Sequence, residues 1–192
     1  MNKNIVEYKS IYYPPGGILL WIIITLELLT FDMALVALVY FSKEELQLFH
    51  SSRLLLNINL GIINTIVLLT SGFFMAIAAN YFKKNDFVKV RLYLNLVLLS
   101  GILFCVLKGF EFYHKFSAGI TLDTNVFFTF YWLLTGFHYI HVVVGLVIIG
   151  FLLRRVNKNI TISHEDFEGG AAFWHMCDLI WLIVFPVIYL IF

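Results

Sequence analysis

The chain has 192 residues, of which 61% are hydrophobic and only 13% are charged, and its mean hydropathy is +0.89. A soluble protein carries roughly 45–50% apolar and about 25% charged residues, so this chain has too few charges to cover a surface that faces water. The net charge of +1 leaves no basic excess for a nucleic-acid partner. The composition therefore predicts a membrane protein that binds no nucleic acid.

Apolar segments bounded by charged or turn residues follow one another along the chain. A bilayer core needs about 20 mainly apolar residues for each helix that crosses it. The predicted spans are Ile18 to Phe41, Asn57 to Tyr81, Leu92 to Tyr113, Val126 to Leu153, and Ala171 to Phe192. Because only short loops separate these spans, we predict an all-α fold: one membrane domain over residues 1–192, built as a polytopic bundle of five transmembrane helices.

The basic residues predict the orientation of the bundle. Nine of the 13 Lys and Arg residues lie in the N-terminal tail or in the loops that follow the second and fourth spans. The positive-inside rule then puts the N-terminus in the cytoplasm and the C-terminus outside. These nine residues are Lys3, Lys9, Lys83, Lys84, Lys89, Arg91, Arg154, Arg155 and Lys158.

Small residues recur four positions apart, as Gly72 with Ala76 and as Gly101 with Cys105 and then Gly109. Such spacing lets helix backbones approach closely in lipid. Both cysteines lie in apolar runs without metal-ligand spacing, and we interpret them as packing residues.

Ionisable residues inside the spans need a partner, because each costs about 2.5–3.5 kcal/mol in hydrocarbon on insertion scales. The first span contains Glu27 and Asp32, whose separation by five residues points them to different faces of a helix. One interpretation is that each is a protonated carboxylic acid bonded to a neighbouring helix. The alternative for Glu27 is a proton-exchanging residue or a contact with a lipid headgroup.

The third span ends in the sequence KGFEFYHK, which begins at Lys108 and mixes charged with aromatic residues. Lys108 and Glu111 are three positions apart and can pair on one helix face. We interpret the cluster as an interfacial anchor within an aromatic belt.

The fourth and fifth spans carry a cluster of histidines and acids. His138 and His141 lie roughly 60° apart on one helix face, and His175 and Asp178 lie three apart at the predicted mouth of the last helix, shortly after Glu168. We predict a buried hydrogen-bond network, without a metal, that fixes the fourth span against the fifth, with the first two spans as the outer flank. A metal or haem site is the alternative, although two histidines three apart on one helix rarely ligate one haem.

Four motifs resemble those of subunit III of the haem-copper oxidase superfamily. The string TGFHYIHVVVG, from Thr135, resembles its "TGxHxxHVxxG" segment, and KGFEFYHK is similar to its "KGxEYxxK". FEGGAAFWHMCDLIWLIVFPVIYL is similar to the family's terminal helix, and Glu27 occupies the position of the acidic residue in its first shared helix. Met176, Cys177 and Pro186 depart from the oxidase pattern.

The resemblance implies an accessory subunit that is not catalytic by itself and works in respiratory electron transport. This chain would bind no cofactor, and its partner would be a catalytic, haem-bearing membrane subunit that holds haem with copper or iron. It would also bind phospholipid and support assembly and proton uptake, in the inner (plasma) membrane of a bacterium.

The five-helix form resembles both bacterial oxidase subunits and NorE-type proteins associated with nitric oxide reduction. The segment LNINLGIINTIVLLTSG is similar to the NorE second span, so we favour a NorE-like protein. The first alternative is subunit III of a quinol or cytochrome c terminal oxidase. A stand-alone haem-binding membrane oxidoreductase that uses three of the histidines is the second. The residues predicted for structural, proton or lipid contacts are Glu27, Glu111, His138, His141, Glu168, His175 and Asp178; none is predicted to be catalytic or to bind metal.

Overall fold

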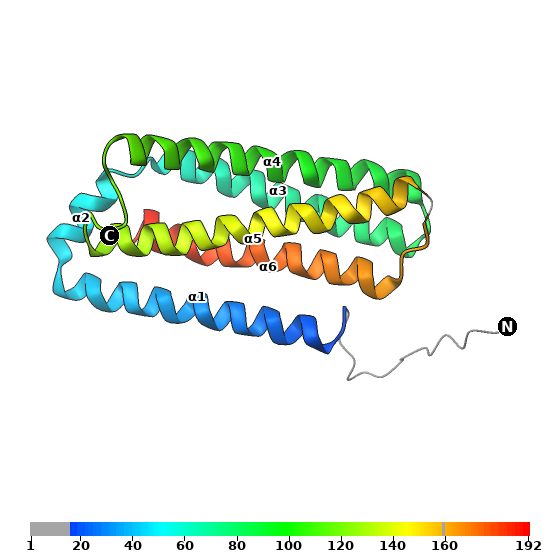
Figure 1. Cartoon of the computed structure of the whole chain (residues 1–192), viewed down its shortest axis with the longest axis horizontal. Coiled ribbons are helices and arrows are strands. Elements are labelled where there is room, and N and C mark those ends of the chain that lie inside the picture. The colour runs from blue at the N-terminus through cyan, green and yellow to red at the C-terminus, as the bar shows by residue number, and fades with distance from the viewer. Residues whose placement is uncertain (1–15, 159) are drawn as a thin grey trace.

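The structure is a computed structural model that describes residues 16–158 and 160–192. Regular secondary structure in this part is entirely helical, and five helices are long and apolar enough to cross a membrane. The predicted all-α bundle of five membrane-spanning helices is therefore confirmed, whereas Lys3 and Lys9 lie outside the described residues. In chain order the helices are α1 (Ile18–Glu44), the short α2 (Leu46–Leu54), α3 (Ile58–Lys83), α4 (Phe87–Ser117), α5 (Val126–Asn157) and α6 (His164–Tyr189) (Figure 1).

Side-chain caps fix where four of the helices begin. The side-chain oxygens of Asn57, Asp86, Asn125 and Ser163 each accept a backbone N–H from the first turn of the helix that follows. The first turn of α6 is polar, with two acidic residues that suit the positive end of a helix dipole. Helix α6 therefore begins at His164. The predicted start at Ala171 was too late, because a search for apolar windows misses a polar first turn.

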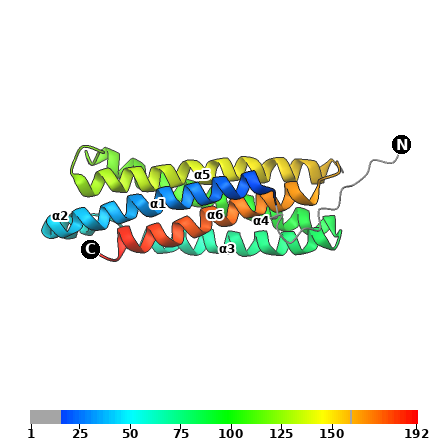
Figure 2. The ribbon, with the colours of Figure 1, turned by 90° about the horizontal axis from the view of Figure 1, so that it is seen from below.

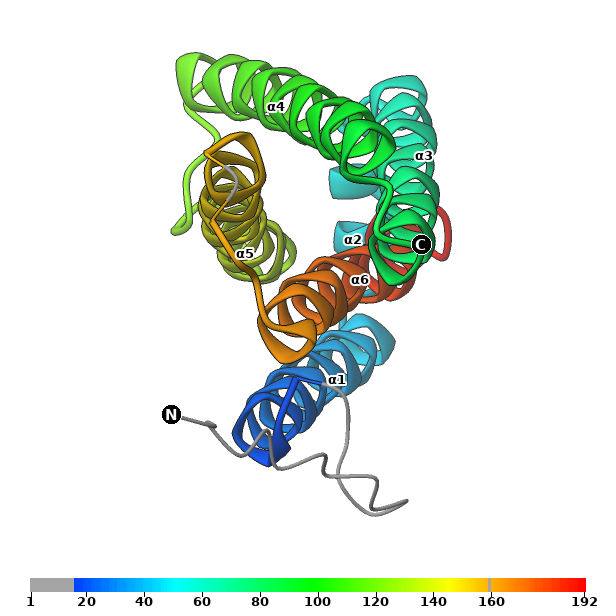
Figure 3. The same cartoon turned by 90° about the vertical axis from the view of Figure 1, so that its right-hand side faces the viewer.

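Helices α3, α4, α5 and α6 pack side by side in sequence, and α6 returns to α3 (Figure 3). We call this arrangement the four-helix ring. Glycines bring its members close together: a Cβ added at Gly101 of α4 would lie 2.7 Å from the indole of Trp174 on α6. The predicted packing role of Gly101 is thus confirmed, and α6 is the best-buried helix, with 61% of its apolar window inside the protein.

Helix α1 lies outside the four-helix ring, along α5 and α6 (Figure 2). Only 22% of its apolar window is buried, so most of its surface faces outward. Helix α2 follows α1 at one end of the bundle and inserts Phe49 against Phe127 and Phe192. The expectation that the first two spans form the outer flank is correct for α1 but wrong for α3, which is a member of the ring.

Candidate functional site

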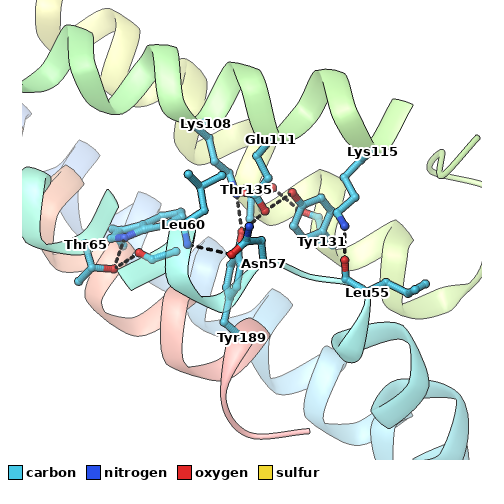
Figure 4. A network of polar contacts seen from close by, with 12 residues as sticks. Leu55, Asn57, Leu60, Thr65, Lys108, Glu111, Lys115, Tyr131, Thr135 and Tyr189 are labelled. Atoms are coloured by element: carbon cyan, nitrogen blue, oxygen red, sulfur yellow. Dashed lines mark hydrogen bonds and ion pairs between the residues drawn. The ribbon is translucent and has the colours of Figure 1, made fainter. Parts of the chain in front are cut away.

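A buried polar cluster joins three helices inside the four-helix ring. Lys108 and Glu111 of α4 meet Tyr131 of α5 and Tyr189 of α6, and their side chains point toward one another in Figure 4. Lys108 is 0% and Glu111 only 4% exposed. We call these four residues the lysine–glutamate cluster.

Every charge in the lysine–glutamate cluster has a partner. The ammonium of Lys108 lies 3.0 Å from Oε2 of Glu111 and donates to the hydroxyl of Tyr189 at 2.6 Å. The other carboxylate oxygen, Oε1, accepts from the hydroxyls of Tyr131 at 2.9 Å and Tyr189 at 2.6 Å. A buried charge pair is tolerated when further hydrogen bonds satisfy its remaining donors and acceptors. The arrangement is therefore suited to holding helices together.

Aromatic rings surround the ammonium group. Lys108 Nζ lies 5.0–5.3 Å from four ring centres, within the distance at which a cation is attracted to a ring face. The rings belong to Phe112, Tyr131, Trp181 and Tyr189.

The predicted pairing of Lys108 with Glu111 is confirmed, but their interpretation as an interfacial anchor is wrong. Both side chains are buried in the protein, because the tyrosines of two other helices complete their hydrogen bonds. Lys115, one turn beyond Glu111, does reach the end of the bundle, where it donates to the carbonyl of Leu55.

Glu27 of α1 meets His141 of α5 at the seam between these helices. Oε2 of Glu27 lies 3.3 Å from Nε2 of His141, and the two side chains are 24% and 12% exposed. The other ring nitrogen, Nδ1, lies 2.8 Å from the carbonyl of Phe137, which requires a proton on Nδ1. The pair can therefore share one further proton, held either by the carboxyl group or by Nε2.

His138 is fully buried and behaves as an aromatic ring. It stacks on Trp181 at 5.1 Å and meets Phe104 edge-on at 5.8 Å. Neither of its ring nitrogens has a hydrogen-bond partner among the described residues. The predicted hydrogen-bond network is wrong for His138, although the ring does pack α5 against α6.

His175 and Asp178 lie in the middle of α6, not at its mouth, because the helix begins at His164. Nδ1 of His175 is 3.5 Å from Oδ2 of Asp178. The pair faces Gly72 of α3, where an added Cβ would lie 2.1 Å from the Asp178 carboxylate. The expectation that this pair fixes the fourth span to the fifth is therefore wrong: it borders α3.

Glu168 lies near the start of α6, where its carboxylate is 3.2 Å from the ammonium of Lys83 at the end of α3. Both side chains are partly open to solvent, so this ion pair contributes little stability. It links the same two helices as the contact at Gly72.

Tyr131, Tyr189 and Trp181 are site residues that sequence reasoning missed. Trp181 stacks on His138 and donates from Nε1 to the hydroxyl of Thr65 on α3 at 2.9 Å. The sequence offered only a general indication of their role: a buried Tyr or Trp usually needs a hydrogen-bond partner for its polar atom. Within residues 16–158 and 160–192, no three His, Cys, Asp or Glu side chains gather closely enough to hold a metal ion.

Comparison with known proteins assigns the chain to a family. A sequence model described as Cytochrome c oxidase subunit III matches residues 17–191. This chain belongs to the cytochrome c oxidase subunit III family. The match extends over all five membrane-spanning helices. The predicted resemblance to subunit III of the haem-copper oxidases is thus confirmed, and the chain is a multi-pass membrane protein.

Individual members of the cytochrome c oxidase subunit III family resemble the chain over about two thirds of its length. The protein from Spodoptera frugiperda is 30% identical over 130 residues, which are 67% of this chain and 86% of that protein. A probable subunit 3 from Mycobacterium leprae is 30% identical over 141 residues, 71% of this chain and 68% of the relative. For Polypterus ornatipinnis the identity is 33% over 130 residues, 67% of this chain and 49% of the relative, so the chain spans about half the length of that protein.

Proposed function

We propose that this chain is a non-catalytic subunit III that packs against a catalytic, haem-bearing membrane subunit and supports its assembly, proton uptake and durability in respiratory electron transport. The observation that carries the proposal is the lysine–glutamate cluster, the most deeply buried charged group described. Its charges pair with one another and with tyrosine hydroxyls, and these bonds join α4, α5 and α6.

The positions of the histidines support the same proposal over a stand-alone haem enzyme. His138 stacks on Trp181, His141 pairs with Glu27, and His175 pairs with Asp178. These three histidines thus lie at different helix contacts: α5 with α6, α5 with α1, and α6 with α3.

Co-purification tests the proposed function. The tagged chain is purified from its own membranes in a mild detergent, and we expect a larger subunit with a haem absorption spectrum to accompany it. A Soret band from the isolated chain would instead support the stand-alone enzyme.

We propose further that the complex is NorE-like. The support is the segment LNINLGIINTIVLLTSG, which begins just before α3 and is similar to the NorE second span. Rates of nitric oxide and oxygen consumption by the purified complex distinguish this subtype from a terminal oxidase: nitric oxide reduction is expected, and consumption of oxygen alone would identify a quinol or cytochrome c oxidase.

The proposed location of the protein is the inner membrane of a bacterium, with the N-terminus in the cytoplasm. Basic residues at the ends of α3 and α5, at the start of α4 and in the adjoining loops support this orientation. Single cysteines introduced at Lys84 and Asp123 should react with an impermeant thiol reagent from opposite sides of the membrane, with the Asp123 site accessible in intact spheroplasts.

Bound phospholipid is proposed at the end of the bundle where α1 turns into α2. A cavity of about 590 Å³ lies there, with mainly apolar walls and with Lys43 and His50 in its lining. Apolar walls beside a cation suit an acyl chain and its phosphate. Lys43→Gln should lower the amount of anionic phospholipid that remains with the purified complex, whereas Lys84→Gln at the opposite end serves as the control.

Glu27 is proposed to exchange a proton with His141, because the two side chains are close enough to share one and remain partly exposed at the α1–α5 seam. In the assembled complex, Glu27→Gln should slow turnover or shorten the active lifetime. Glu44→Gln, at an exposed acid near the end of the same helix, is the matched control. Unchanged turnover and lifetime in Glu27→Gln would remove the functional role and leave a purely structural contact.

A further inference from the structure

Asp32 is an acidic side chain that faces outward from the middle of a membrane-spanning helix. It is exposed on α1, and it forms no hydrogen bond or ion pair within the part of the chain that the structure describes. Glu27 on the same helix, by contrast, has its partner in His141, 3.3 Å away. An acid in a membrane span needs a partner or a purpose, and this chain does not supply one for Asp32.

The depth of Asp32 restricts what that partner can be. At 1.5 Å per residue, it lies about 21 Å from the start of α1 at Ile18 and about 18 Å from its end at Glu44. The hydrocarbon core of a bilayer is about 30 Å thick, so this position lies inside it. A side chain with one methylene group cannot reach the headgroups from there, and acyl chains offer no hydrogen bonds. The partner must therefore itself enter the membrane.

Asp32 lines an open groove between α1 and α6. The groove has a volume of about 560 Å³ and mainly apolar walls, to which Val36 contributes from α1 and Ile183 and Val187 from α6. Lys43 lies at the far end of this lining, about 16 Å along α1 from Asp32, which is too far for an ion pair. The carboxyl group and the apolar walls thus belong to one surface that is open from outside the bundle.

The exposed stripe of α1 that contains Asp32 has the spacing and the length of a helix contact. Its members recur alternately four and three positions apart, and all are exposed: Thr25, Leu29, Asp32, Val36 and Val39. This spacing places them on one face of α1 over about 21 Å, and helix pairs in membranes commonly pack with it. A small molecule would cover only part of this stripe, whereas a membrane-spanning helix follows all of it. We call the stripe and the adjoining groove the Asp32 surface.

We propose that the Asp32 surface is the docking site for a transmembrane helix of another membrane protein, and that this helix carries a basic side chain opposite Asp32. Charge complementarity selects that side chain, because a protonated Lys, Arg or His neutralises the carboxylate and donates hydrogen bonds to it. The proposal goes beyond the accessory-subunit function and does not depend on it, since it rests on Asp32 and the groove alone.

Site-specific photo-crosslinking in the membranes of the native cell tests the docking site. A benzophenone amino acid replaces Val36, which is 70% exposed, and in a control variant it replaces Val106, which is 61% exposed on α4, across the bundle from α1 (Figure 3). We expect illumination to join the Val36 variant to one other membrane protein, through a transmembrane segment that contains Lys, Arg or His. Mass spectrometry of the joined peptides identifies the segment, and the Val106 variant should not give this product.

The other outcomes overturn the proposal. Products that join Val36 to a second copy of this chain, to lipid alone, or to a transmembrane segment without a basic residue refute it, and so does the absence of any product specific to Val36. A haem-bearing subunit that co-purifies in these cases leaves the accessory-subunit function intact. The expected product without any haem-bearing subunit would support the docking site and refute the accessory function, so the two failures are distinguishable.

Substitution of Asp32 in the Val36 crosslinking variant tests the charge. Asp32→Asn should lower the yield of the product about tenfold, which corresponds to about 1.4 kcal/mol, whereas Asp32→Glu should restore most of it. Glu44→Gln, at an exposed acid near the end of the same helix, should leave the yield unchanged. An unchanged yield in Asp32→Asn would show that no charge is recognised and would overturn the proposal. The amount of folded chain, measured beside the yield, should not fall, because no described residue is bonded to Asp32.

Discussion

Replacement of Glu111 by Gln should be among the most destabilising single changes in this protein. Glu111 accepts from Lys108 at 3.0 Å and from two tyrosine hydroxyls at 2.9 and 2.6 Å. Glutamine keeps one acceptor oxygen but carries no charge, so the cation stays buried without its counter-charge, and in either orientation of the amide one of the former donors meets an NH₂ group. Breaking a buried pair in this way costs about 3–5 kcal/mol of unfolding free energy.

The partner substitution, Lys108→Met, should cost less, about 1–3 kcal/mol. Both tyrosine hydroxyls still donate to Glu111 in this variant, and the carboxyl group can take up a proton. The double variant should be more stable than the sum of the single losses predicts, by about 0.5–3 kcal/mol, because the residues are in contact.

These free energies can be measured by unfolding the chain in mixed micelles with increasing SDS while tryptophan fluorescence is followed. Trp181 is a local probe, since its ring centre lies 5.3 Å from Lys108 Nζ. Asp166→Asn, which breaks an exposed 3.0 Å pair with Arg155, is the control and should cost about 0–1 kcal/mol. If Glu111→Gln costs no more than this control, or if the two single losses simply add, the Lys108–Glu111 pair does not stabilise the fold.

Two further predictions concern helix packing and helix capping. Gly72→Ala would press a methyl group onto Asp178 and should lower the unfolding free energy by about 1–3 kcal/mol, measured in the same SDS titration. Gly150→Ala is the control and should not destabilise the chain, because a Cβ added there has no neighbour within 4 Å. The backbone N–H of Lys89 donates to Asp86 and holds the pKa of that carboxyl below its ordinary value of 3.8, so its contribution to stability is present above pH 3.8 and is lost as the pH falls through the lowered pKa. Asp86→Ala should therefore lower the thermal unfolding midpoint at pH 7, and a difference from wild type that failed to shrink in acid would contradict this account.

The sequence predicted the helical bundle well because lipid imposes a simple rule of apolar length. It also predicted that Glu27 and Asp32 face different surroundings: Glu27 meets His141, whereas Asp32 lines the exposed groove beside α6. Both predictions depend only on local spacing along one helix. The start of α6 was misplaced because its first turn is polar and is fixed by the Ser163 cap, which hydropathy does not detect.

The partners of the buried residues could not be predicted, because they depend on how helices rotate against one another. Lys108 donates a hydrogen bond to Tyr189, which lies 81 positions away in the chain. Nothing in the spacing of residues within either span predicts that this tyrosine is the partner. His138 has a polar side chain in an apolar span, and the sequence favours a hydrogen-bonded role for it. Packing overrides that expectation, since the ring is enclosed between Trp181 and Phe104.

The peripheral place of α1 has a consequence for the order in which the protein is made. Helix α1 leaves the ribosome before α3 and α4, yet the ring helices that it contacts, α5 and α6, are synthesised after them. Glu27 must therefore remain without its histidine partner until His141 has been inserted. A chain that stops before α5 leaves this acid unpaired by His141.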